Sequence, residues 1–300
     1  MHQPSTSAVS ALLACASALL GGCASNLAPV RTLAEQTYKL SASFDPMLAG
    51  TVNSCTDNAL RKRLIMSERY DAQASEQAAR SDCAPIARAS ASMATLNEVL
   101  LRYAQTLAAV ADSKVPLYKD EFQGLGDSLG SLQLQGAAAP LLDAGKLSKV
   151  MQLSEHLSQL ATQRLQKSAL RELLDEQEAV NIVSNALKDY AQRIYRAGLQ
   201  DELRDLDLLR GAVDGAAQRE PLAANYIRTR LHLEGRQLQE REKIVSAYVA
   251  AVDALQASVA ALRASLERLQ APELAQQLAQ FARHVEALQR QAVFYAPARW

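Results

Sequence analysis

The amino-acid sequence predicts an all-α protein, an elongated antiparallel helical bundle with long coiled-coil-like helices. The helix formers Ala, Leu, Gln, Glu and Arg dominate the chain. Clusters of β-branched residues and alternation of apolar with polar residues are scarce, so strands are not expected. With 300 residues, of which 49% are hydrophobic, the chain is long enough to bury a sizeable core.

The first element is a predicted signal peptide. Residues 8–20 are almost wholly small or apolar, and this run is about half as long as a membrane-spanning helix. It ends in Leu20-Gly21-Gly22-Cys23, which resembles the lipobox of bacterial lipoproteins: a Leu, two small residues and then a cysteine. The resemblance covers about residues 1–25. It implies cleavage before Cys23, a diacylglycerol on the Cys23 thiol and acylation of the new amine.

This resemblance divides the chain into a signal peptide (1–22), a lipidated N-terminus with its tether (23–32) and a helical bundle (33–300). Ala24, directly after the cysteine, implies sorting to the outer membrane with the protein facing the periplasm. Two or three acyl chains would make the attachment effectively permanent without any spanning segment. The alternative interpretation is an N-terminal helix buried in a core, with Cys23 as an ordinary thiol.

Cys55 and Cys83 remain after the signal peptide is removed, and we expect them to form a disulfide in an oxidising compartment. An unbroken helix between them would hold the sulfurs roughly 40 Å apart, whereas a disulfide needs Cα atoms about 5.5 Å apart. The chain must therefore reverse, and the small, polar residues 71–81 are the expected place. The alternative is two buried free thiols. Metal binding is not expected, because no nearby Cys or His completes a ligand set.

Helices are predicted at residues 30–40, 55–70 and 85–111. Residues 41–54 contain an Asp-Pro pair and a glycine, and they are predicted to form a loop or a broken helix. The helix at 85–111 carries a single apolar stripe made by Leu96, Leu100, Tyr103, Leu107 and Val110.

The main break in the predicted organisation lies at residues 112–145, which hold two prolines and five glycines. A short helix is expected within it at 119–134, and a subdivision of the bundle would fall here. Apolar residues at helical spacing resume after Gly145 and continue to Glu220-Pro221, although three glycines weaken the later part. The apolar positions are Val150, Leu153, Leu157, Leu160, Leu173, Val180, Leu187 and Ile194.

The clearest pattern is a heptad repeat over residues 224–269, in which twelve of fourteen a and d positions are apolar. The a positions are Ala224, Leu231, Leu238, Val245, Val252, Val259 and Leu266, and the d positions are Ile227, Glu234, Arg241, Tyr248, Leu255, Leu262 and Leu269. A helix over residues 222–269 would be about 72 Å long. Such a stripe favours packing within an antiparallel bundle, with self-association or docking on a partner's helices as the alternative.

Two d positions are charged. Glu234 and Arg241 indicate a salt-bridged or solvated end of the bundle, and the alternative is a functional polar pocket between helices. A last helix is predicted at residues 272–291, with Leu274, Leu278, Phe281, Val285 and Leu288 on its inner face.

One motif suggests catalysis. Residues 126–130 match GxSxG and resemble the signature of the GDSL hydrolases, which implies Ser128 as a nucleophile. No buried strand precedes the motif and no Asp-x-x-His follows it, so we interpret the match as a coincidence. His156, His232 and His284 are expected on the surface or at its rim. Residues 61–63 (Arg-Lys-Arg) are expected to form a charged helical face, with contact to anionic lipid head groups as the alternative.

The sequence therefore predicts a non-catalytic protein without cofactor or metal. Lys plus Arg and Asp plus Glu number 32 each, so no nucleic-acid partner is expected. The expected partners are a membrane, through the lipid on Cys23, and a protein or second copy, through helix faces. The predicted function is a lipid-anchored envelope protein with a structural, adaptor or assembly role that acts by protein–protein contact. The alternative is a periplasmic carrier or sensor that binds an apolar ligand between helices.

Overall fold

The computed structural model describes residues 27–66, 70–112, 141–160 and 166–292, and within these ranges it is all-α and contains no strand, as predicted. The helices follow in the order α2 (Ala28–Ala42), α3 (Asp45–Met66), α4 (Ala72–Asp82), α5 (Ala84–Ala111), α7 (Ala144–Leu160), α8 (Gln166–Asp175), α9 (Gln177–Tyr190), the π-helical turn η1 (Ala191–Tyr195), α10 (Arg196–Ala216), α11 (Pro221–Ala264) and α12 (Pro272–Ala292).

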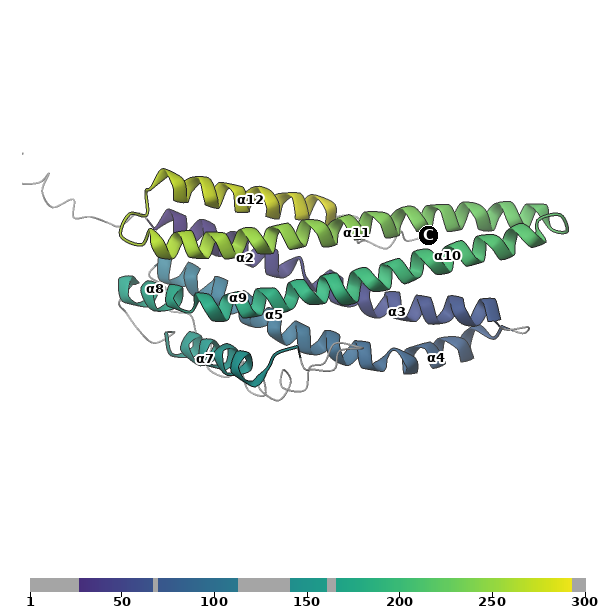
Figure 1. The fold of residues 1–300 in the computed structure, drawn as a ribbon, viewed down its shortest axis with the longest axis horizontal. Helices are drawn as coiled ribbons and strands as arrows, with labels where there is room; N and C mark the ends of the chain where they lie inside the picture. The colour runs from purple at the N-terminus through teal and green to yellow at the C-terminus, as the bar shows by residue number, and fades with distance from the viewer. Residues whose placement is uncertain (1–26, 67–69, 113–140, 161–165, 293–300) are drawn as a thin grey trace, which may run out of the picture.

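The helices lie roughly along one long axis (Figure 1). The longest of them, α11, packs against α12, α10, α9 and α2, and α2 in turn packs against α5. The chain enters α2 at one end of the bundle, whereas the α3–α4 and α10–α11 turns lie at the opposite end. One continuous core joins Leu27 to Leu288, so the helices on both sides of residues 113–140 share it. The predicted helix at 119–134 lies outside the described residues.

The prediction of a loop or broken helix at residues 41–54 is wrong for most of that range. Only Ser43 and Phe44 separate α2 from α3, and the Asp-Pro pair begins α3 instead of interrupting it. Proline is tolerated in the first turn because the N–H that it lacks has no partner there. Gly50 stays helical and lies against Tyr195, where a Cβ would be only 2.9 Å from the phenol oxygen.

The disulfide between Cys55 and Cys83 is present, with Cα atoms 5.9 Å apart. The place of the chain reversal was predicted wrongly, because residues 72–82 form α4. α3 ends at Met66 and α4 follows from Ala72, so the change of direction precedes α4. The Asp71 side chain caps α4 by accepting a hydrogen bond from the Ala74 N–H at 2.9 Å. A small, polar composition is thus compatible with an exposed helix once a capping residue precedes it.

The heptad repeat on α11 is largely confirmed, because all of its apolar a positions from Ala224 to Val259 are buried. Ile227, a predicted core position, is 40% exposed, and the helix ends at Ala264, before Leu269. By length and composition α11 could cross a membrane, but half of its most apolar window is buried inside the bundle, as in the core helix of a soluble protein. The inner face predicted for α12 is buried at all five positions.

Two buried tyrosines provide a test of the core. The Tyr190 hydroxyl lies 2.6 Å from the Ser90 hydroxyl, whereas the buried Tyr248 hydroxyl has no hydrogen-bond partner among the described residues. We expect Tyr190→Phe to lower the free energy of unfolding by about 1 kcal/mol, because Ser90 loses its partner. Tyr248→Phe should leave it unchanged or raise it by up to about 1 kcal/mol, because it removes an unpaired buried group. Urea denaturation measures both, and equal losses of stability would contradict this account.

Candidate functional site

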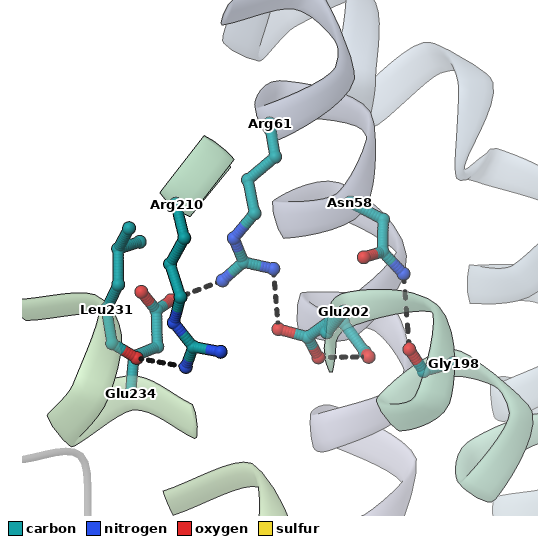
Figure 2. A network of polar contacts seen from close by, with 8 residues as sticks. Asn58, Arg61, Gly198, Glu202, Arg210, Leu231 and Glu234 are labelled. Atoms are coloured by element: carbon teal, nitrogen blue, oxygen red, sulfur yellow. Dashed lines mark hydrogen bonds and ion pairs between the residues drawn. The ribbon is translucent and has the colours of Figure 1, made fainter. Parts of the chain in front are cut away.

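A group of charged and polar side chains lies between α3, α10 and α11, and we call it the polar cluster (Figure 2). Its members are Ser54, Asp57, Asn58, Arg61, Glu202 and Glu234. Glu234 is one of the two charged d positions of the heptad repeat. Its pairing with Arg61 confirms the salt-bridged interpretation for Glu234. For Arg241, the other charged d position, the Nε atom has no hydrogen-bond partner among the described residues.

Arg61 is the centre of the polar cluster and is only 8% exposed. One of its Nη atoms donates to Glu202 at 2.9 Å, and the other donates to Glu234. Ser54 also donates to Glu202. The expectation that residues 61–63 form a solvated charged face is therefore wrong for Arg61. The charge is tolerated in the interior because two carboxylates compensate it.

Glu202 and Asp57 illustrate the electrostatic balance of the cluster. Burial raises the pKa of Glu202, although hydrogen bonding from Ser54 and the charge of Arg61 oppose the shift. Burial also raises the pKa of Asp57, against the charges of Arg61 and Arg241. The cost of desolvating a carboxylate therefore outweighs the local cations at both positions. The ion pairs of Arg61 with Glu202 and Glu234 link α3 to α10 and α11.

His156, His232 and His284 are exposed or half-buried and lie on different helices. In His156, Nδ1 lies 3.0 Å from Glu176 and Nε2 lies 3.4 Å from Glu172. Sequence reasoning missed this contact, since Glu172 belongs to α8 and Glu176 lies between α8 and α9, both later in the chain. In the ranges that the structure describes, no group of three or more His, Cys, Asp or Glu side chains could hold a metal ion.

A groove with a volume of about 620 Å³ lies next to the polar cluster, on an adjacent face of α3. We refer to this feature as the groove. Its first wall is α3, from Thr51 to Met66. Its second wall is the α4–α5 junction with Asp82, Cys83 and Ile86, and its third is η1 with the start of α10. The disulfide thus joins two of the walls.

Two glycine positions set the third wall close to the first. The Tyr195 ring packs on Gly50, and at Gly198 a Cβ would lie 3.2 Å from the Ser54 hydroxyl. The Asn58 amide N–H donates to the Gly198 carbonyl at 3.3 Å. Asn58 lines both features, so the polar cluster and the groove share one residue.

A third feature is a set of exposed apolar residues on and near the two turns at the end of the bundle opposite the start of α2. We call these the distal apolar residues: Leu64, Ile65, Met66, Tyr70, Leu208, Leu222, Tyr226 and Ile227. Met66, Leu222 and Tyr226 are 85%, 84% and 68% exposed. They lie on α3, at Tyr70 just before α4 and on the α10–α11 hairpin. The C-terminal end of α3, the N-terminal end of α4 and the α10–α11 hairpin lie at the same end of the molecule in Figure 1.

Of the residues singled out in the sequence, Cys55 and Cys83 line two walls of the groove and Glu234 belongs to the polar cluster. Cys23 and Ser128 lie outside the described residues. No protein-family model, no curated protein and no solved structure matches this chain.

The raised pKa of Glu202 predicts a pH dependence of stability. The folded protein binds the proton of the Glu202 carboxyl more tightly than the unfolded chain does. Protonation of Glu202 therefore stabilises the fold fully at pH values below the unfolded pKa, and this stabilisation is lost as the pH rises through the folded pKa. We therefore expect wild type to lose stability relative to Glu202→Gln as the pH rises above 4.5, the ordinary pKa of a glutamate.

Chemical denaturation at several pH values measures this difference. Glu155→Gln is the matched control, because Glu155 is exposed on α7, which among the described helices packs against α5 and α9 and not against those of the polar cluster. A difference between wild type and Glu202→Gln that stays constant with pH would show that burial does not control this carboxyl.

Proposed function

We propose that the protein is a lipid-anchored envelope protein that acts by protein–protein contact, in a structural, adaptor or assembly role and without catalysis. Its anchor is the lipid on Cys23. Its location is the outer membrane, with the bundle facing the periplasm.

The distal apolar residues carry the proposal for contact. Monomeric proteins rarely expose large apolar side chains close together, and aromatic residues and Met are enriched in protein interfaces. Here two separate turns of the chain present such side chains at one end of the bundle. A partner that covers them would remove apolar surface from water, which is the main favourable term in association.

The position of these residues fits an anchored protein. Few residues separate Cys23 from Ala28, where α2 begins, so a lipid on Cys23 would hold this end of the bundle near the membrane. The distal apolar residues lie at the other end. Since α11 has 44 residues, about 66 Å of helix separates the two ends, and the contact would be made well away from the anchoring membrane.

The disulfide supports an extracytoplasmic location. Structural disulfides form and persist in oxidising compartments such as the bacterial periplasm and are rare in the cytosol. The Cys55–Cys83 disulfide closes the α3–α4 hairpin, so the fold uses the bond in its architecture. This agrees with a protein that is exported before it folds.

Replacement of the lipidated cysteine tests the anchor. We expect Cys23→Ala to move the protein from the membrane fraction to the soluble periplasmic fraction, because the acyl chains supply the attachment. The matched control is Cys15→Ala, which changes a cysteine within the predicted signal peptide. This variant should stay in the membrane fraction, as the wild type does. Fractionation with immunoblotting measures both, and a Cys23→Ala protein that stays in the membrane fraction would contradict the proposal.

Site-specific photocrosslinking tests the contact. A photoreactive amino acid at Tyr226 or Met66 should give discrete adducts with one protein in intact cells, and the same group at Tyr38 should not. Tyr38 is a suitable control because it is 48% exposed but belongs to α2. The double variant Met66→Ser, Tyr226→Ser should abolish the adduct formed from a third position, Leu222. Identical adduct patterns from the control and the distal positions would contradict contact through this end.

A further inference from the structure

The groove between α3, the α4–α5 junction and η1–α10 has an apolar interior and an elongated form. Its α3 wall runs from Thr51 to Met66, about 22 Å along the helix axis. Its volume of about 620 Å³ falls in the range of small-molecule sites. This form suits an extended hydrocarbon chain better than a compact ligand. The apolar lining includes Cys55, Ala59, Cys83, Ile86 and Ile194.

The charges around the groove favour an anion. Both carboxylates of its lining are already paired, Asp82 with Arg63 at 2.8 Å and Asp201 with Arg204. The Lys62 ammonium, in contrast, forms no hydrogen bond or ion pair with any residue that the structure describes. A carboxylate head group at Lys62 would therefore gain a cation without displacing an existing partner.

The opposite wall supplies a second cation. Arg193 lines the groove from η1, and its Nε forms an ion pair with Asp189 at 3.9 Å, a distance too long for a hydrogen bond. Single π-helical turns inside α-helices occur frequently at functional sites. Here the turn contributes both Arg193 and the apolar Ile194 to the same wall.

We propose that the groove is a binding site for a long-chain carboxylate. Its hydrocarbon chain lies along the apolar interior beside the Cys55–Cys83 disulfide, and its head group pairs with Lys62. Burial of methylene groups supplies the affinity, and the cation selects a carboxylate over an uncharged head group. The groove shares Met66 with the distal apolar residues. Its proposed head-group contact, Lys62, is not one of them, so loss of carboxylate binding would leave the proposed contact function untouched.

The test uses the full-length protein in lipid nanodiscs with two photoactivatable probes, palmitate and hexadecanol, each carrying a diazirine on the chain. We expect saturable labelling of α3 and α10 peptides by the palmitate probe, competed by unlabelled palmitate and mapped by mass spectrometry. The hexadecanol probe should bind about three- to fivefold more weakly, as expected for loss of one exposed ion pair.

Two pairs of variants separate head group from chain. Lys62→Gln should weaken binding of the palmitate probe about three- to fivefold and leave binding of the hexadecanol probe unchanged. Its control is Lys243→Gln, at an exposed lysine of α11, which should change the binding of neither probe. Ala197→Trp should fill the groove and abolish saturable labelling by both probes. Ala223→Trp, at an exposed alanine of α11, is its control for folding and labelling.

Labelling that maps outside the groove, is not saturable or survives Ala197→Trp would overturn the site. Equal binding of the two probes to wild type, with no effect of Lys62→Gln, would overturn the assignment of a carboxylate. If Ala197→Trp loses its helical circular dichroism, the peptide map and the Lys62→Gln comparison still decide both points.

Discussion

The apolar stripe of α11 is longer than the set of helices that covers it, and this mismatch determines the form of the molecule. Toward its C-terminal end α11 is fixed to α9, where Lys188 pairs with Asp253, and to α8, where Asp175 pairs with Arg263. Toward its N-terminal end α10 is its main neighbour, joined to it by the Arg228–Asp214 pair. One half of α11 therefore lies in a multi-helix core and the other half in a hairpin. Ile227 is exposed for this reason, although its heptad position is correct.

The second constraint is the close approach of α3 to η1 and α10. Gly50 and Gly198 allow this approach, because at both places a Cβ would crowd a side chain of the other element. Once the helices are this near, their polar residues lose water and must compensate one another. Arg61 and Glu202 do so, and the raised pKa of Glu202 shows that the compensation is incomplete. Desolvation of the buried charges thus offsets part of the free energy gained by packing. The crossing of α3 with η1 and α10 also forms two of the three walls of the groove.

The helices that sequence reasoning placed well are those whose apolar residues repeat without interruption, such as α5, α11 and α12. The regular spacing of the apolar residues indicates which face of the helix is buried, and it does so whichever neighbouring helix covers that face. The errors came from signals with two meanings. An Asp-Pro pair marks a turn or the first turn of a helix, and only contacts such as Tyr195 on Gly50 decide between them. The partners of Arg61 lie 141 and 173 residues away, so no local pattern could show that this arginine is buried. The disulfide could be predicted because the cysteine count and the compartment expected from the lipobox resemblance suffice, without the path of the chain.

The disulfide and the polar cluster act on different faces of α3, and together they fix its position and its rotation. The disulfide ties α3 to the α4–α5 junction at Cys55, while Ser54 and Arg61 tie it to Glu202 on α10. A helix held on two faces cannot turn about its axis, so the residues it presents to the groove are determined by the fold and need no ligand to arrange them. A preorganised site loses less conformational entropy on binding. The buried charges cost desolvation energy, but they also set which face of α3 points into the groove. An apolar contact could not determine this rotation as specifically.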